Sequence, residues 1–265
     1  MTTKPIHIAN FVFDYNSDFN KICDELSGAY TWILREEPMK NNLLLKVNFA
    51  PTDPEYSVKI TESAPEIKTK LTIGICSLYR RQAYLFRLLK YIYEYLREEP
   101  NKEQIQFLIF VDPEDRTTGE KRNIIIENAN SDYFCFIDDD DLVSPHYFKE
   151  ILNKINHPIQ VDGIGFSGIV FRFDEKNNLH EFYKFTHTMQ CQFKHWEGEP
   201  FKTRHFNTLN HLNPIKMDLV KQVKFKDLVW SEDVNYWEEM KDLVKSEYFI
   251  NKDLYYYLWR GNHHD

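Results

Sequence analysis

The side chains best suited to chemistry form a run of four aspartates, Asp138 to Asp141, directly after the apolar segment YFCFI. Adjacent carboxylates repel one another, and a crevice that excludes water makes it costly to keep them ionised. A divalent cation removes that cost, and carboxylate oxygens suit Mg²⁺ or Mn²⁺, which share their coordination with substrate phosphates. The run therefore predicts a metal-assisted phosphate site, and the alternative is a solvated acidic turn.

A second polar group, GEKRN at residues 119–123, opens the helix predicted before that segment. A helix N-terminus offers free N–H groups and the positive end of a dipole to an anion. Lys121 and Arg122 add positive charge at this end, where cations need an anionic partner. A bound diphosphate or the aspartate run would supply it, and ordinary surface charge is the other interpretation.

Further polar groups end two other predicted strands. Ser77 and Arg80 lie in CSLYRR after the strand LTIGIC, and Asp112 ends the strand QIQFLIFVD. Ligands of open α/β sheets bind beyond the C-terminal ends of the strands. Ser77 is therefore placed to bond a ribose or base, and Asp112 to accept from a base N–H. A capped helix start with two surface arginines, and a turn before Pro113, explain the same residues without a ligand.

The segment WSED contains the adjacent acids Glu232 and Asp233. Neighbouring carboxylates can have their pKa values pushed apart, which leaves one basic enough to take a proton from a hydroxyl. A helix that begins after Ser231 would carry the same residues for stability alone, since acids in the first turn complement the helix dipole.

The histidines give a weaker signal. His263 near the C-terminus is a candidate third metal ligand, or part of a frayed tail. Four others fall in an irregular stretch whose spacing matches no common zinc pattern. These four are His187, His195, His205 and His211.

The elements that would position these groups alternate from Leu71 onward. Buried strands are predicted at LTIGIC, QIQFLIFVD and YFCFI, and helices at RQAYLFRLLKYIYEYLREE, GEKRNIIIENAN and SPHYFKEILNKI, the last with Ser144 as its N-cap. This alternation predicts a doubly wound, parallel α/β sheet. After Val161 the patterns indicate a hairpin (GIGFSGIVFRF and HEFYKF), helices at PIKMDLVKQV and SEDVNYWEEMKDLVK, and closing strands YFI and DLYYYLW.

Residues 1–68 are predicted to form a separate small α+β appendage. One short helix is expected around Phe19 to Leu26, with strands at HIANFVF, YTWIL, LLLKVNF and EYSVKI. No motif with chemical meaning occurs there. The remaining chain, 69–265, carries every candidate site residue and is predicted to be the catalytic domain.

Composition limits the class of protein. The chain has 265 residues, of which 33 are basic and 41 acidic, so its net charge of −8 argues against nonspecific coating of nucleic acid. No apolar run approaches the roughly 18 residues of a membrane span. The N-terminus lacks a signal-peptide pattern, and four scattered cysteines suit a reducing compartment. We expect a soluble, cytoplasmic protein; low glycine with abundant lysine and asparagine suggests a phage source, and then the host cytoplasm.

Taken in order, GEKRN, YFCFIDDDD, HLNPIK and WSED resemble the motifs of family 2 glycosyltransferases with the A fold. The resemblance covers about residues 70 to 260. It implies a Rossmann-like, doubly wound A-type domain that uses a nucleotide-diphosphate sugar, with a UDP-sugar favoured. It also implies a Mn²⁺ or Mg²⁺ cofactor and transfer of a hexosyl or pentosyl group with inversion.

The resemblance assigns roles to individual residues. Asp140 would bind the metal, and Asp138 would lie near the ribose and the metal. Asp233 would be the catalytic base, with Glu232 positioning the acceptor. Nucleotide contacts are expected from Ser77, Arg80, Asp112, Lys121, Arg122, Asn123, Asp138 and Asp139.

The acceptor stays open between a glycan hydroxyl and a hydroxymethylated base of phage DNA. Aromatic residues that could stack on either are Phe166, Phe171, Phe182, Tyr183, Phe185, Trp196 and Trp237, unless they belong to the core. Two other functions compete: a nucleotidyltransferase, which would not need the Glu–Asp pair, and a non-catalytic sugar-nucleotide-binding module. A metal-dependent phosphohydrolase or nuclease would spread its ligands over several strand ends.

Overall fold

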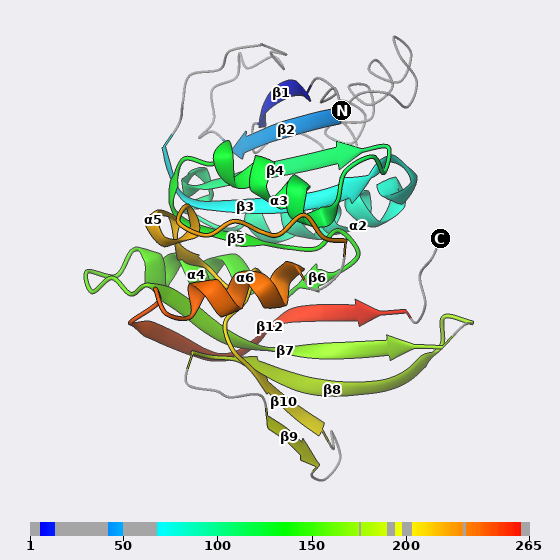
Figure 1. Ribbon diagram of the computed structural model, residues 1–265, viewed down its shortest axis with the longest axis vertical. Coiled ribbons are helices and arrows are strands. Elements are labelled where there is room, and N and C mark those ends of the chain that lie inside the picture. The colour runs from blue at the N-terminus through cyan, green and yellow to red at the C-terminus, as the bar shows by residue number, and fades with distance from the viewer. Residues whose placement is uncertain are drawn as a thin grey trace.

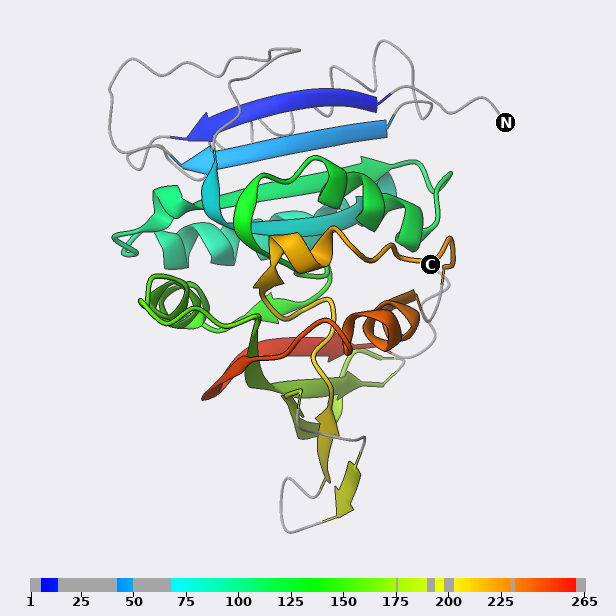
Figure 2. The same cartoon turned by 60° about the vertical axis from the view of Figure 1, so that its left-hand side comes forward.

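The computed structural model describes residues 6–13, 42–49, 68–174, 176–189, 194–197, 203–229 and 232–260. The strands within these ranges form one mixed sheet of order β1-β2-β4-β3-β5-β11-β7-β8-β10-β9, with β12 paired to β6 and β7 (Figure 1). The sheet runs the length of the molecule, from β1 at one end to β9 at the other (Figure 2).

The strands are β1 Ile6–Phe13, β2 Asn42–Phe49, β3 Thr69–Leu78, β4 Ile105–Asp112, β5 Ser131–Phe136, β6 Leu142–Val143, β7 Gly163–Phe173, β8 Leu179–His187, β9 Lys194–Glu197, β10 Thr203–Asn207, β11 Ile215–Lys216 and β12 Glu247–Trp259. The helices are α2 Gln82–Leu96, α3 Thr118–Glu127, α4 Tyr147–Ile155, α5 Met217–Val220 and α6 Glu232–Met240, with short 3₁₀ turns η1 Tyr79–Arg81 and η2 Lys102–Gln104.

The centre of the sheet is the parallel trio β4-β3-β5. Every residue of β4 is buried, which explains why its sequence is an almost unbroken apolar run rather than an alternating one. Because the three strands are parallel, their carboxyl ends meet at one edge of the sheet. That edge carries Ser77, Asp112 and the aspartate run.

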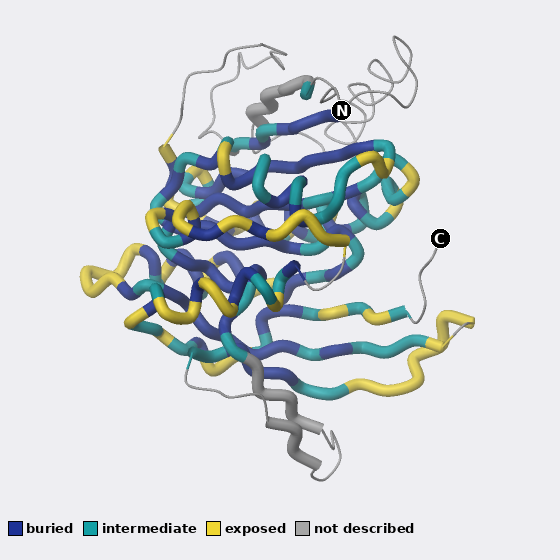
Figure 3. The backbone as a smooth tube through the Cα atoms, viewed as in Figure 1, coloured by how far each residue is buried: buried dark blue, intermediate teal, exposed yellow. Residues whose placement is uncertain are grey.

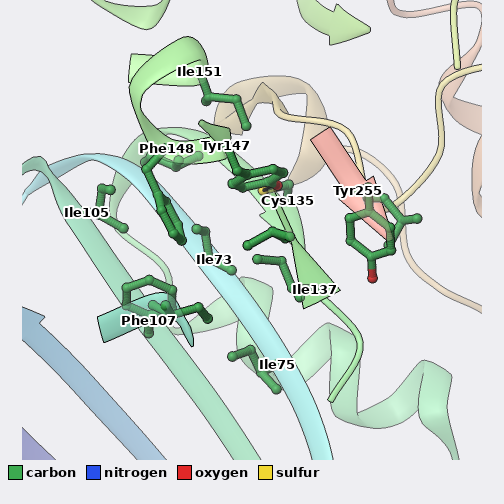
Figure 4. Close-up of a cluster of buried hydrophobic side chains, with 14 of the residues drawn as sticks. Ile73, Ile75, Ile105, Phe107, Cys135, Ile137, Tyr147, Phe148, Ile151 and Tyr255 are labelled. Carbon is green, nitrogen blue, oxygen red and sulfur yellow. Dashed lines mark hydrogen bonds between the residues drawn. The ribbon is translucent and has the colours of Figure 1, made fainter. Parts of the chain in front are cut away.

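Two hydrophobic clusters cover the two faces of this trio. Alternate residues of the strands pack under α2 and α4 on one face, as Ile73, Phe107 and Cys135 do with Tyr147 and Phe148 of α4 (Figure 4). The intervening residues pack under α3, α5 and α6 on the other face. Helices on both faces confirm the doubly wound α/β prediction, although the complete sheet is mixed rather than parallel.

The second half of the sheet is built from β7, β8 and β12. Strands β7 and β8 form the predicted antiparallel hairpin, whose turn is exposed (Figure 3). The two predicted closing strands are one strand, β12, which runs parallel to β7 with irregular register between Ile250 and Tyr255. A bulge keeps pairing continuous where sequence patterning shows a break.

Two predicted helix starts differ from the structure. α4 begins at Tyr147 with His146 at its N-cap, because Ser144 instead closes a turn by accepting from the N–H groups of both residues. The segment PIKMDLVKQV starts with the two residues of β11, which pair with β5, and only then forms the short α5. Pairing with the buried β5 overrides the helical pattern there.

The described parts of the N-terminal region extend the same sheet. β2 pairs antiparallel with β4, and β1 pairs parallel with β2. The predicted helix near Phe19 and the strands YTWIL and EYSVKI lie outside the described residues, and the boundary at residue 68 stays a prediction. Across the described ranges, no helix is long and apolar enough to cross a membrane.

Candidate active site

The aspartate run leaves β5 at the edge where β3 and β4 also end. The backbone N–H of Asp141 donates to the carbonyl of Asp138 at 3.1 Å, which closes a tight turn. The four carboxylates make contacts with different partners on several elements. Arg122 beside Asp138, and Arg81 beside Asp139 and Asp140, offset part of the repulsion expected of four adjacent anions.

Two members of the run are bound by Ser77 at the end of β3 and by Arg81 in the turn that follows. The hydroxyl of Ser77 donates to Asp139 Oδ2 at 2.6 Å. Arg81 Nη2 lies 2.6 Å from Asp139 Oδ1 and 2.8 Å from Asp140 Oδ2. Burial raises the pKa of Asp139 to about 6, although Arg81 opposes that shift. Ser77 and Arg81 therefore hold the middle of the run.

Asp141 is enclosed and fastens β12 to the run. Its Oδ2 accepts from the hydroxyl of Tyr255 and its Oδ1 from the N–H of Leu258, both at 2.8 Å. The Tyr255 oxygen also accepts from the N–H of Asp138 at 3.1 Å. Burial, together with the nearby Asp140 and Asp138, raises the pKa of Asp141 well above its usual range.

Asp138 is bound from two directions. Arg122 Nη2 lies 3.2 Å from its Oδ1, and His211 Nε2 lies 3.4 Å from its Oδ2. Burial alone would raise the pKa of Asp138, but His211 and Arg122 outweigh it and hold the pKa below its usual range. Arg122 and His211 therefore favour the ionised form of Asp138.

Arg122 connects the run to the WSED segment. Its Nη1 donates to Glu232 Oε1 at 2.7 Å while its Nη2 binds Asp138. The guanidinium lies 5.3 Å from the ring centre of Phe136 and 5.2 Å from that of Phe225. A planar guanidinium can pair with two carboxylates and stack on rings at once, which an ammonium cannot. Arg122 thus joins the aspartate run to Glu232, which lies 110 positions after Arg122 in the sequence.

The start of α3 brings these segments together. Thr117 caps the helix by accepting from the N–H of Glu120 at 3.2 Å. Gly119 allows residues 226–228 to approach, since a Cβ there would lie 1.8 Å from the carbonyl oxygen of Lys226. The side-chain amide of Asn123 donates to the carbonyl of Phe225 at 2.8 Å and accepts from its N–H at 2.9 Å. Its predicted nucleotide contact stays a prediction, and its observed role is to hold residue 225.

Asp233 lies in the first turn of α6 and keeps 34% of its side chain exposed. His211 is its neighbour, with Nδ1 3.9 Å from Asp233 Oδ2. Glu232 is buried, and burial raises its pKa despite the opposing Arg122. The two acids therefore have different environments: Glu232 is committed to Arg122, and Asp233 is open to an incoming group.

Asp112, at the end of β4, is fully enclosed. Its Oδ1 accepts from Lys121 Nζ at 3.0 Å, and its Oδ2 from the N–H groups of Asp115 and Arg116 at 3.1 and 3.3 Å. Burial raises the pKa of Asp112, although Lys121 opposes the shift. Asp112 thus closes the turn after β4 and anchors α3, and its predicted contact with a base stays a prediction.

Arg80 makes a bidentate pair with Glu114 on the surface, at 2.9 and 3.1 Å. Its predicted nucleotide contact stays a prediction. Arg81, the next residue, binds Asp139 and Asp140 of the run. Sequence reasoning also missed His211, which it considered only for zinc, and Tyr255. The signal available for His211 was its position in HLNPIK, between the two acidic motifs.

Two carboxylates of the aspartate run, those of Asp138 and Asp140, are accessible to a divalent ion. No group of three or more His, Cys, Asp or Glu side chains among the described residues is arranged to hold one. Asp138 and Asp140 each keep 30% of the side chain exposed. Mg²⁺ and Mn²⁺ commonly bind one or two protein carboxylates, with waters and substrate phosphates completing the shell. These two carboxylates fit an ion that binds with a diphosphate; His263 lies outside the described residues.

This geometry defines a class: an α/β enzyme with a carboxylate run at a strand end opposite a Glu–Asp helix start. Residues 90–224, about half of the chain, match the profile described as glycosyl transferase family 2, and the chain therefore belongs to that family. This is the family that the motif resemblance predicts. No curated protein sequence matches the chain.

Solved structures of S. aureus TarS are similar to this chain. The 1–349 fragment in complex with UDP-GlcNAc is 13% identical, with a TM-score of 0.45, and the match covers 74% of this chain and 60% of that one. A second structure of the 1–349 fragment is 14% identical, with a TM-score of 0.44, and the match covers 72% of this chain and 60% of that one. For TarS itself the coverage of its chain is 37%. The chain thus spans about 60% of the length of the fragment.

Proposed function

We propose that this glycosyltransferase moves a sugar from a UDP-sugar to an acceptor hydroxyl, with inversion and with the help of Mn²⁺ or Mg²⁺. The observation that carries the proposal is the connection of Asp138 to both acids of WSED, through Arg122 to Glu232 and through His211 to Asp233. The aspartate run and the candidate base thereby lie in one site, which supports the proposal.

Asp233 is the proposed base. Its partly exposed carboxylate takes the proton from the acceptor hydroxyl as that oxygen attacks the anomeric carbon. The bond between the anomeric carbon and the diphosphate oxygen breaks in the same displacement, and its electrons leave with the nucleoside diphosphate. One displacement from the opposite face inverts the anomeric configuration. Glu232 holds Arg122, and its predicted contact with the acceptor is part of the proposal.

The donor side of the site is rich in paired charges. Asp140 and Asp138 would hold the divalent ion, which, when bound, supplies positive charge to the leaving diphosphate. Ser77 and Arg81 keep Asp139 in place beside them. The proposed nucleotide contacts of Ser77, Asp139 and the α3 residues rest on this neighbourhood.

The acceptor is proposed to be a glycan hydroxyl or, as the second class, a hydroxymethylated base of phage DNA. Of the aromatic residues considered for stacking, Phe166, Phe185 and Trp237 are buried in the core. Phe182 is 39% exposed and stacks on Phe171 across the β7–β8 hairpin. That hairpin is the better candidate for an acceptor surface. A cytoplasmic location stays a prediction.

Binding of the donor is tested by thermal melting with a panel of nucleotide sugars, with Mn²⁺ and then with a chelator. A ligand that binds only the folded state raises the melting temperature by mass action. We expect a metal-dependent rise with a UDP-sugar. A rise with nucleoside triphosphates and with no nucleotide sugar would instead support a nucleotidyltransferase.

The base is tested by Asp233→Asn, with Glu238→Gln on the exposed face of the same helix as the control. We expect Asp233→Asn to lower turnover of the UDP-sugar by about 10³-fold, the scale of general-base catalysis, while the Kd for UDP is unchanged. Glu238→Gln should be neutral. Wild-type turnover in Asp233→Asn would refute the assignment, and donor binding without turnover by the wild-type chain would favour a binding module.

A further inference from the structure

His211 lies between the two acidic motifs in the same way as Arg122. Arg122 contacts Asp138 and Glu232, and His211 approaches Asp138 with Nε2 and Asp233 with Nδ1, at 3.4 and 3.9 Å. The side chain is 93% enclosed, and Nδ1 has no hydrogen-bond partner within the described parts of the chain. A buried ring nitrogen without a hydrogen-bond partner lowers the stability of the folded state. Such an atom in a native structure calls for an explanation, and a functional contact is one. The carboxylate of Asp233 is the acidic group beside it.

The segment that carries His211 is held firmly. The backbone carbonyl of His211 accepts from the N–H of Phe136 at 2.8 Å, and Phe136 lies two residues before the aspartate run. Asn213, two residues on, accepts from the N–H of Asn210 at 3.0 Å and donates to the carbonyl of Ile164 at 3.1 Å. These bonds tie the turn at 210–213 to β5 and β7, so the imidazole is presented from a rigid support.

Asp233 has less support of its own. Its Oδ1 accepts from the N–H of Val234 at 2.9 Å, and the remainder of the carboxylate faces solvent and His211. A rotation that moves Oδ2 by about 1 Å would bring it within hydrogen-bond distance of Nδ1. Among the described residues, His211 is the side chain that lies between this carboxylate and Asp138.

We propose that His211 is a positioning residue: it holds Asp233 at a set distance from Asp138, and thereby aligns the base with the donor. The proposal rests on the function proposed for Asp233. A small misplacement of a catalytic group can cost about 10²-fold in rate, because the reacting atoms no longer meet in a near-attack geometry. Loss of His211 therefore lowers kcat more than it raises the KM for the donor.

Two substitutions of His211 distinguish the contact made by Nδ1 from the contact made by Nε2. Asn places an amide nitrogen near the position of Nδ1, which faces Asp233, and Gln places one near the position of Nε2, which faces Asp138. We expect His211→Gln to lower kcat by about 30-fold with less than a threefold change in donor KM. His211→Asn keeps an amide toward Asp233 but loses the contact with Asp138, so we expect it to lower kcat as well, by less than His211→Gln does and again with less than a threefold change in donor KM. A purely structural role would instead change donor KM and the melting temperature in step with kcat.

The controls distinguish the failure of this proposal from that of the base assignment. His187→Gln changes a buried histidine that contacts the same turn through Asn213, and should lower the melting temperature without separating kcat from KM. In the Asp233→Asn background, His211→Gln should cost no further rate. If Asp233→Asn is inactive while His211→Gln keeps wild-type kcat, only the positioning role is overturned. If Asp233→Asn keeps wild-type turnover, both proposals fall.

Discussion

Replacing Arg122 by Met tests whether this side chain holds the site together. Arg122 and Glu232 keep only 5% and 8% of their side chains exposed, whereas Asp138 keeps 30%. Met fills similar space between Phe136 and Phe225 but has no charge. The substitution leaves the Glu232 carboxylate buried without its partner, and leaves Asp138 with His211 alone.

The expected loss is dominated by Glu232. Removing one partner of a buried ion pair costs about 3 to 5 kcal/mol, because the other charge stays desolvated. The Asp138 contact adds less, since water reaches that carboxylate. We expect Arg122→Met to lose about 4 kcal/mol of unfolding free energy, or roughly 10 °C in melting temperature for a chain of this size.

The assay is chemical unfolding of four proteins: wild type, Arg122→Met, Glu232→Gln and the double variant. Gln removes the buried charge, so the double variant should recover about 2 kcal/mol relative to Arg122→Met, and the cycle should show that coupling. A loss below about 1 kcal/mol in Arg122→Met, or a double variant no more stable than Arg122→Met, would refute the reasoning.

The pH dependence gives an independent check on the same pair. Burial already raises the pKa of Glu232, and loss of Arg122 removes the group that opposes this rise. A carboxyl group whose pKa is higher in the folded state than in the unfolded state stabilises the folded state at pH values below the unfolded-state pKa. That stabilisation is lost as the pH rises through the folded-state pKa. The deficit of Arg122→Met should therefore be smallest near pH 4 and grow toward pH 8. The same deficit at both pH values would contradict a buried, uncompensated Glu232.

Three further predictions concern neighbouring groups. The pKa of Asp139 is raised from 3.8 to about 6, so wild-type stability measured against Asp139→Asn should fall by about 2 kcal/mol as pH rises from 4 to 7. Tyr255→Phe leaves a carboxylate oxygen and a backbone N–H unpaired, and urea unfolding should show a loss of about 2 kcal/mol. Gly119→Ala should lower the free energy of unfolding by about 2 to 3 kcal/mol, because the added Cβ meets the backbone carbonyl of Lys226. Gly163→Ala should lower it less, because there the Cβ meets the flexible end of the Leu209 side chain. Equal losses in the two variants would contradict this reasoning.

Much of the architecture follows from local pattern. Continuous apolar runs at β3, β4 and β5 separate cleanly from amphipathic helices, because a strand buried on both faces and a helix buried on one have different periodicities. The position of the aspartate run at a strand end followed from the same patterns. The motif order from GEKRN to WSED was enough to predict the family that the profile match then showed.

The class of fold, the family and the polar residues at the strand ends could therefore be predicted from local pattern and motif order. Which partners these residues have depends on three-dimensional packing: Arg81 rather than Arg80 contacts the run, Asp141 binds β12, and His211 lies between Asp138 and Asp233. The physical reason is that periodicity and caps are local properties of the chain. A pair such as Arg122 and Glu232, 110 positions apart, depends on how helices from different parts of the chain pack on one sheet.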